Sequence, residues 1–239
     1  MKFVVATCSF NQENIIEKFI DEYVKILEIL KNKKEIDEYN IHLIDDGSTD
    51  NTWANIKLKS NNNKNIKGIR LKKNIGQHFA CFFLAGRING DYISFVNADL
   101  DITPDNIIEI INIFKEEKSK IIISIADNRP IINKILSNIF FYITKLLSNL
   151  DTPGNVTAIS IDSDISENLK NYIGPKFFTV YNIANLNLPV RIHKTLKKKN
   201  YNTSSYTLKS RLYLAISTLT RIILSKLFFE KDITIEEEI

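Results

Sequence analysis

The sequence predicts an α/β protein built on a mainly parallel sheet, and two patterns carry this prediction. Short segments rich in β-branched residues alternate with longer segments of helical periodicity through residues 1–125. Several of the short segments are apolar throughout, as strands covered on both faces are. Such alternation implies right-handed strand–helix–strand units, as in Rossmann-like folds, with helices on both sides of the sheet. Ligands of these sheets bind beyond the carboxyl ends of the strands.

The expected strands are short and rich in Ile, Val and Phe. They are residues 2–7 (KFVVAT), 41–46 (IHLIDD), 66–71 (IKGIRL), 91–96 (DYISFV) and 120–126 (KIIISIA).

Two helices are expected between these strands. Residues 13–30, ENIIEKFIDEYVKILEIL, place their large apolar side chains on one broad stripe. Residues 105–117 follow Thr103 and Pro104, a helix-start signal with proline close to the first helical position. Both helices should therefore pack one face against the sheet.

The pattern changes after residue 126. Residues 131–150 and 211–229 read as long amphipathic helices, which form a C-terminal extension of the sheet. Residues 155–161 and 190–196 between them read as further extended segments. No flexible linker marks the change, so we expect residues 1–125 and 126–239 to be two halves of one continuous domain.

Composition restricts the class of function. The chain has 239 residues and a formal net charge of +4, which gives no bulk electrostatic case for binding nucleic acid. Two cysteines, Cys8 and Cys81, are read as buried free thiols in a reducing compartment. The start of the chain lacks the features of a secretory signal, and no apolar run approaches the ~18 residues of a membrane span. We therefore expect a cytoplasmic protein, with peripheral contact at the inner membrane face left open.

The segment IHLIDDGSTDNT, residues 41–52, ends a strand with two acids and a glycine. Taken residue by residue it describes a strand–turn–helix junction, with Gly47 in the turn and Ser48, Thr49 or Asp50 as helix cap. The whole string resembles the DDGSxDxT signature of family-2 glycosyltransferases, which have the GT-A fold. The resemblance implies that Asp45 hydrogen-bonds the base of a nucleotide-sugar donor.

Other segments follow in the family order. SFNQENI at 9–15 resembles the first-strand turn that touches the nucleotide, and NIGQHFACFFLAG at 74–86 is similar to a segment of the polyprenyl- and dolichyl-phosphate glycosyltransferase branch. GDYISFVNADLDITPD at 90–105 resembles the strand that leads to the metal-binding DxD turn, and KKNYNTSSYT at 198–207 resembles the loop over the donor diphosphate. The resemblance makes residues 1–125 the nucleotide-sugar half and residues 126–239 the acceptor side.

The resemblance also implies a set of donor-binding residues. They are Cys8, Phe10, Gln12, Asp45, Gln77, Asn97, Ala98, Ser204 and Tyr206. Some positions depart from the family pattern: Cys8 stands in place of a proline, Phe10 of a tyrosine and Ala126 of an arginine. In the last loop Lys199, Asn202 and Ser205 replace arginine, glycine and lysine. These departures bear on donor identity and acceptor class more than on the fold.

The turn NADLD, residues 97–101, begins with an amide where the family pattern has an acid. Asn97 still offers an amide oxygen and two N–H donors for sugar hydroxyls. In an extended segment Asn97, Asp99 and Asp101 would share one side, and Asp99 and Asp101 would supply the carboxylates for Mg²⁺ or Mn²⁺. We interpret NADLD as a rearranged metal site; the alternative is a polar turn that caps the helix near Thr103.

The resemblance assigns catalytic roles to Asp99, through the metal, and to Lys199, a cation beside the diphosphate leaving group. A polyprenyl phosphate acceptor is ionised near neutral pH and needs no strong base. A sugar hydroxyl needs a carboxylate to accept its proton, and Asp151, Asp162 and Asp164 are the candidates that the sequence offers.

The resemblance therefore implies an inverting, metal-dependent transferase that moves a sugar from a nucleotide sugar to a polyprenyl phosphate or lipid-linked glycan, as in bacterial surface polysaccharide synthesis. Two alternatives stay open: transfer to a sugar hydroxyl without membrane contact, and a nucleotide- or partner-binding module that has lost turnover. The two amphipathic helices suit an anionic lipid surface, packing on the core, or a homo-oligomer interface. The base, the sugar, the acceptor and the oligomeric state are left open.

Overall fold

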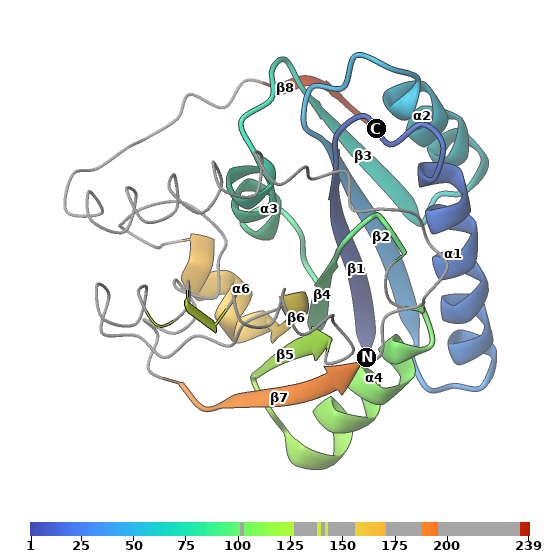
Figure 1. The fold of residues 1–239 in the computed structure, drawn as a ribbon. Coiled ribbons are helices and arrows are strands. Elements are labelled where there is room, and N and C mark those ends of the chain that lie inside the picture. Colours follow the sequence, from blue (N-terminus) through green and yellow to red (C-terminus); the bar gives the residue numbers. More distant parts are fainter. Residues whose placement is uncertain (101–102, 127–137, 140–141, 143–155, 171–187, 196–234) are drawn as a thin grey trace.

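The computed structural model describes residues 1–100, 103–126, 138–139, 142, 156–170, 188–195 and 235–239. Within them the chain forms one eight-stranded sheet of order β7-β5-β6-β4-β1-β2-β3-β8 (Figure 1). The strands are β1 (Lys2–Ser9), β2 (Glu38–Asp45), β3 (Ile66–Leu71), β4 (Tyr92–Val96), β5 (Ile121–Ala126), β6 (Val156–Asp162), β7 (Val190–Thr195) and β8 (Ile235–Glu238). The prediction of an α/β protein with a mainly parallel sheet is confirmed.

The centre of the sheet is parallel and its flanks are mixed. β4, β1, β2 and β3 run side by side in one direction. β6 is inserted antiparallel between β4 and β5, whereas β7 runs parallel to β5. β8 pairs antiparallel with β3 at the far edge. The carboxyl ends of the four central strands therefore meet at one edge of the sheet.

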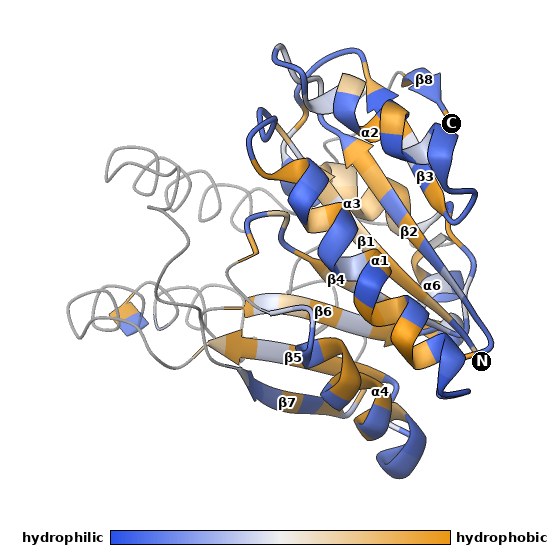
Figure 2. Ribbon diagram, turned by 90° about the vertical axis from the view of Figure 1, so that its right-hand side faces the viewer, coloured by the Kyte–Doolittle hydropathy of each residue, from blue (hydrophilic) through white to orange (hydrophobic). Residues whose placement is uncertain are grey.

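Helices cover both faces of the sheet. α1 (Ile16–Asn32), α2 (Thr52–Asn62) and α4 (Asn106–Glu117) share one apolar core with the sheet. α3 (Gln77–Ala85) packs on the opposite face, and α6 (Ser163–Lys170) joins the same second core. The hydropathy view shows apolar strands between helices whose outer sides are polar (Figure 2). Burial of this kind on both faces explains why the strands read as continuous apolar runs.

The first helix begins later than its periodicity suggested. The stripe is buried as expected, with Phe19, Ile20 and Leu27 fully covered. However, α1 starts at Ile16 and not at residue 13, and residues 13–15 form a turn whose Ile15 and Ile16 N–H groups donate to the Gln12 carbonyl. Residues 9–14 also bond to the loop after β2. The sequence of this turn thus serves a neighbouring loop as well as the helix start.

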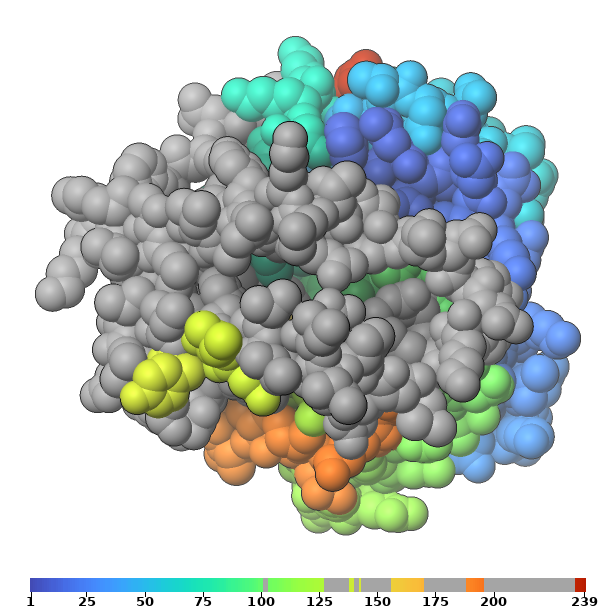
Figure 3. Space-filling view, in the orientation of Figure 1, coloured from blue at the N-terminus to red at the C-terminus, as the bar shows by residue number. Residues whose placement is uncertain are grey.

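The second half of the chain is described only in parts. β6 and β7 confirm the expected strands at 155–161 and 190–196. The expected helices at 131–150 and 211–229 lie outside the described residues, apart from 138–139 and 142. Ile139 and Tyr142 there are 53% and 64% exposed. The described residues of this segment appear in yellow-green on the face shown in Figure 3. No helix in the described part of the chain is long and apolar enough to cross a membrane. The division at residue 126 stays a prediction.

Candidate functional site

The ends of β1, β2 and β4 bring the predicted site residues to one edge of the sheet. Ser9 is paired with Asp45 in the parallel register of β1 and β2. Thr7 Oγ1 donates a hydrogen bond of 2.8 Å to the Val96 carbonyl, which joins the end of β1 to the end of β4. Asp45 and the turn that begins at Asn97 therefore lie on either side of β1, at its carboxyl end.

The turn after β1 is held by the loop after β2. The Asn11 N–H donates to Ser48 Oγ at 2.9 Å, and the Gln12 N–H donates to Thr52 Oγ1 at 2.7 Å. In return, Asn11 Oδ1 accepts from the Thr49 N–H at 3.0 Å. Most of the polar side chains of DDGSTDNT thus bind the 9–14 turn. Their spacing reflects this cross-loop bonding as well as the start of α2.

Phe10 lies at this turn with 42% of its surface exposed. Asn11, the next residue, has a left-handed backbone with φ of 51°. Asparagine tolerates that conformation better than most side chains do. An exposed aromatic ring beside the strand ends suits stacking on a flat ligand group.

Asp45 is fully buried at the end of β2. Its Oδ1 accepts hydrogen bonds from the backbone N–H of Ser48, at 3.3 Å, and from the Ser48 hydroxyl. Its Oδ2 lies 3.5 Å from Arg70 Nε and has no hydrogen bond within the described part of the chain. Burial raises the pKa of Asp45, while the Ser48 hydrogen bonds and the Arg70 guanidinium act in the opposite direction. Asp45 thus has one engaged oxygen and one oxygen without a hydrogen bond.

Asp46, the adjacent acid, has a different task. Its two oxygens accept the backbone N–H groups of Ile75, at 2.7 Å, and Gly76, at 2.8 Å. These bonds fix the loop between β3 and α3 beside the strand ends. Gly47 has φ of 74°, and a Cβ there would lie 2.7 Å from the backbone carbon of Lys73. Sequence reasoning missed this role, since the pair of acids was the only signal and the two look equivalent.

The loop that Asp46 fixes leads into α3 and to the NADLD turn. Gly76 precedes the helix with φ of 95°, a conformation that glycine adopts without strain. Gln77, the first residue of α3, donates from Nε2 to Asn97 Oδ1 at 3.1 Å. Two residues that the resemblance assigned to the donor, Gln77 and Asn97, are therefore in contact with each other.

The NADLD turn itself is not extended, so one part of the sequence prediction is wrong. β4 ends at Val96, and the chain then turns through Leu100, whose φ is 53°. Strand alternation therefore does not relate Asn97 to Asp99, while Asp101 lies outside the described residues and the metal site stays a prediction. Ala98 is buried and Asp99 is half-buried. Burial, and then the charge of Asp99, raises the pKa of Tyr23 on α1, so Asp99 lies near that helix.

The donor types at this turn suit a hard divalent cation. Asn97 offers an amide oxygen and Asp99 a carboxylate, the ligands that Mg²⁺ and Mn²⁺ prefer. No group of three His, Cys, Asp or Glu side chains that could hold a metal occurs among the described residues. Asp101 lies outside them, as do Lys199, Ser204 and Tyr206.

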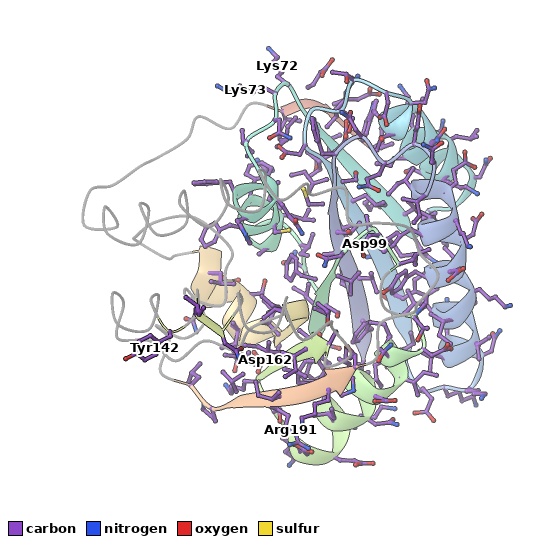
Figure 4. All side chains as sticks on the ribbon, in the orientation of Figure 1. Lys72, Lys73, Asp99, Tyr142, Asp162 and Arg191 are labelled. Carbon is purple, nitrogen blue, oxygen red and sulfur yellow. The ribbon has the colours of Figure 1, made fainter. Side chains whose placement is uncertain are left out.

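The acids considered as a base for a sugar hydroxyl are not at this edge. β6 runs antiparallel to β4, so Asp162 pairs with Tyr92 at the amino end of that strand. Asp164, two residues on, forms an ion pair of 2.6 Å with Lys120. Figure 4 shows Asp162 and Asp99 in separate parts of the molecule. Asp151 lies outside the described residues.

Cys8 lies at the same end of β1, and its side chain is in the core. Cys8 and Cys81 are both buried free thiols. The hydrogen bond between them, together with burial, raises the pKa of Cys8 well above its ordinary value. The Cys8 side chain therefore packs against α3, and the donor-side contribution of this position would come from its backbone.

Comparison with known families accounts for this arrangement. The model of glycosyl transferase family 2 matches residues 4–213. The chain belongs to that family. An uncharacterized glycosyltransferase of Bacillus subtilis, YkoT, is 32% identical over 102 residues, which are 41% of this chain and 29% of that protein. An undecaprenyl-phosphate 4-deoxy-4-formamido-L-arabinose transferase of Yersinia pestis is 29% identical over 108 residues, 45% of this chain and 32% of the relative. The matched part is thus about a third of each relative.

Solved structures share the fold. Glucosyl-3-phosphoglycerate synthase of Mycobacterium tuberculosis, in complex with Mn²⁺, UDP and glucosyl-3-phosphoglycerate, has a TM-score of 0.61 at 12% identity, covering 98% of this chain and 86% of that one. TarS of S. aureus, residues 1–349 in complex with UDP-GlcNAc, has a TM-score of 0.51 at 18% identity, covering 96% of this chain and 68% of that one. The architecture is therefore GT-A, as the sequence motifs implied.

Proposed function

We propose that this family-2 chain is an inverting, metal-dependent glycosyltransferase that moves a sugar from a nucleotide sugar to a polyprenyl phosphate or lipid-linked glycan. The observation that carries the proposal is the meeting of Asp45, Asn97 and Asp99 at the carboxyl ends of β2 and β4, on either side of β1. Clefts at such strand ends are where ligands of α/β sheets bind. Bacterial surface polysaccharide synthesis is the setting that the lipid-phosphate relative suggests.

In this proposal the donor lies along the carboxyl edge. The Asp45 carboxylate accepts a hydrogen bond from the base, and Phe10 offers an exposed ring beside it. Asn97, oriented by Gln77, faces the sugar or ribose hydroxyls. Asp99 and Asp101 would hold Mg²⁺ or Mn²⁺, and the metal would supply positive charge to stabilise the diphosphate. Lys199, with Ser204 and Tyr206, binds the same phosphates.

The reaction follows from this arrangement. An acceptor oxygen attacks the anomeric carbon on the face opposite the diphosphate, and the bond from that carbon to the phosphate oxygen breaks. Its electron pair leaves with the nucleoside diphosphate, so the configuration at the anomeric carbon inverts. The cationic side of the site stabilises the charge that develops on the leaving group.

A phosphate acceptor is favoured over a sugar hydroxyl by the position of the acids. A hydroxyl acceptor needs a carboxylate within hydrogen-bond reach, whereas a phosphate is already ionised. Of the three acids considered for this role, Asp162 and Asp164 lie at the amino edge of the sheet, away from this site, and Asp151 lies outside the described residues. The relative named for an undecaprenyl-phosphate substrate points the same way.

A transfer assay tests the proposal. The full chain is incubated with a panel of radiolabelled UDP- and GDP-sugars, with undecaprenyl phosphate or an oligosaccharide as acceptor, in Mn²⁺, in Mg²⁺ and in EDTA. We expect metal-dependent transfer to the lipid phosphate, reduced at least about 100-fold in Asp99→Asn and unchanged in Asp164→Asn. Transfer to the oligosaccharide alone would support the hydroxyl alternative. Nucleotide binding without turnover on either acceptor would support the module that has lost catalysis.

A further inference from the structure

The terminal strand β8 is seated firmly on the edge of the sheet. The Ile239 and Gly68 backbones exchange two hydrogen bonds of 2.8 Å. The Ile239 side chain packs against the core that α1, α2 and α4 share with the sheet. A Cβ on Gly68 would lie 3.1 Å from Ile239 Cγ1, so the glycine leaves room for this side chain. A strand of three consecutive glutamates is thus held at the edge next to β3, whose own end lies beside Asp45 in the register with β2.

The glutamates of β8 alternate between the two faces of the strand and have different partners. Glu237 accepts a hydrogen bond of 2.8 Å from Trp53 Nε1 and pairs with Lys57, both on α2, which anchors the strand. Glu236 and Glu238 alternate with it and are more exposed. Of these two, Glu236 lies with its Oε2 3.4 Å from Arg70 Nε. Glu238, two residues on, is also exposed.

Arg70 connects β8 to the donor edge. Its Nε lies 3.4 Å from Glu236 Oε2 and 3.5 Å from Asp45 Oδ2, so one nitrogen is within ion-pair distance of both carboxylates, without a hydrogen bond to either. A terminal nitrogen donates to the Ser48 carbonyl at 3.2 Å. Ser48 in turn donates to the other oxygen of Asp45. Arg70 therefore contacts Asp45 directly and also through Ser48.

We propose that β8 is a positioning element of the donor site, in which Glu236 holds the Arg70 guanidinium beside the Asp45 carboxylate that accepts the nucleotide base. This rests on the proposed function, because it gives β8 a role in binding the same donor. A guanidinium with one carboxylate partner keeps more rotamers than one held by two partners from different strands. The predicted ligand is a nucleoside diphosphate whose base presents a ring N–H to Asp45.

The charged groups around Asp45 decide what removal of Glu236 would do. Arg70 on β3 favours the ionised form, whereas burial and the charge of Asp50 favour the protonated form. Asp46 follows directly in sequence, and Cys8 lies near enough on β1 to interact electrostatically. If Arg70 stays in place without Glu236, the loss of a nearby negative charge lowers the pKa of Asp45. If Arg70 moves away, the pKa of Asp45 rises.

The sign of this change tests the proposal. We would follow the Asp45 side-chain carboxyl by ¹³C NMR through a pH titration of the full chain, as wild type, Glu236→Ala, Glu238→Ala and Arg70→Met. The proposal predicts a higher pKa of Asp45 in Glu236→Ala, in the direction of Arg70→Met, and no change in the matched Glu238→Ala. UDP and GDP affinities, measured with Mn²⁺ by calorimetry, should fall about two- to fivefold in Glu236→Ala and at least as much in Arg70→Met, and should stay unchanged in Glu238→Ala. Rescue by Glu236→Asp is expected to be partial.

The outcomes distinguish failure of the β8 proposal from failure of the proposed donor site. A pKa of Asp45 that falls or stays constant in Glu236→Ala overturns the proposal, because Arg70 then needs no help from β8. Equal effects of Glu236→Ala and Glu238→Ala also overturn it, since they reflect general loosening of the strand. If the pKa of Asp45 rises as predicted but wild type binds neither UDP nor GDP, the assignment of the donor site is wrong, and β8 has no role in donor binding. Urea unfolding of each variant shows that the fold is retained.

Discussion

The two ends of the central strands use their polar residues in different ways. At the amino edge, the Lys2 backbone N–H donates to Asp91 Oδ2 at 2.7 Å and its carbonyl accepts the Asp91 N–H at 2.9 Å. A pocket of about 320 Å³ lies beside this closed pair, lined by mixed charges and small polar groups. At the carboxyl edge, three loops bind one another through side chains, and Asp45 Oδ2 has no hydrogen bond among the described residues.

The difference shows which polar groups maintain the fold and which are available for a ligand. A buried carboxylate oxygen without a hydrogen bond is costly, and such an oxygen in a native structure calls for an explanation such as a functional role. Asp46 and Asp91 are satisfied by backbone N–H groups, so their loss should affect stability. Asp45 should affect binding. Adjacent acids in one motif therefore have separable roles.

The largest expected difference between the two edges is in the stability lost when Asp46 or Asp91 is replaced by asparagine. The two Asp46 oxygens accept the Ile75 and Gly76 N–H groups at 2.7 and 2.8 Å. In Asp46→Asn the amide NH₂ would face one of these donors, so we expect a loss of about 3–4 kcal/mol in the free energy of unfolding. Asp91→Asn can still accept the Lys2 N–H and should lose much less. Urea unfolding of both variants measures this, and equal losses would remove the distinction between the edges.

A second contrast uses one glycine from each edge. A Cβ on Gly47 would meet backbone atoms at 2.7 Å, and its φ of 74° strains any other residue. We expect Gly47→Ala to cost about 2–3 kcal/mol. A Cβ on Gly90 at the amino edge would meet a Val4 methyl group at 2.5 Å, without an unfavourable φ. A side chain can shift where backbone cannot, so Gly90→Ala should cost about 1–2 kcal/mol by thermal or urea unfolding.

One pH dependence of stability should come from His42, a residue of the sheet. Burial, with Lys2 and Lys67 nearby, lowers the pKa of His42 to about 4. An unfolded histidine has a pKa of ~6.5, so the unfolded state takes up the proton first as the pH falls. Stability from this group is complete above pH ~6.5 and is lost toward pH 4, by about 2 kcal/mol at pH 5. Urea unfolding between pH 7 and 5 should show this slope in wild type and not in His42→Gln.

The smallest expected effect concerns Cys8, which lies beside the donor edge with its side chain in the core. Because the Cys81 hydrogen bond and burial raise its pKa, Cys8 stays a neutral thiol at pH 8. We expect iodoacetamide to modify it at least about tenfold more slowly in the native protein than in urea. Mass spectrometry of time points measures the rates. Rapid native alkylation, slowed by a nucleotide, would instead put the Cys8 thiol in the donor site.

The sequence predicted the sheet well, because buried parallel strands carry an apolar pattern that does not depend on their neighbours. It could not predict strand order, so the antiparallel insertion of β6, which carries Asp162 away from the site, was found only in the structure. β8 was missed because its three glutamates read as an acidic surface, whereas Trp53, Lys57 and Arg70 hold them in place. Tertiary contacts overrode local propensity there.

Within the site, the sequence motifs located Asp45 and Asn97 but did not predict the roles of the neighbouring residues. Asp46 and Asp45 cannot be told apart in sequence, because their difference lies in which backbone groups face them. The assumption of an extended NADLD turn was wrong because Leu100 adopts a left-handed backbone, which no simple pattern predicts for leucine. The metal ligands stay a prediction, as Asp101 lies outside the described residues.

The most direct test of the donor site is the binding of nucleoside diphosphates to wild type and Asp45→Asn, by calorimetry in Mn²⁺, with Asp91→Asn as the control from the opposite edge. We predict that UDP or GDP binds wild type and Asp91→Asn alike, and binds Asp45→Asn at least about tenfold more weakly, since an amide supplies a weaker acceptor for the ring N–H. CDP, whose base lacks that N–H, should bind poorly throughout. Equal binding of UDP and GDP to wild type and Asp45→Asn would contradict the account.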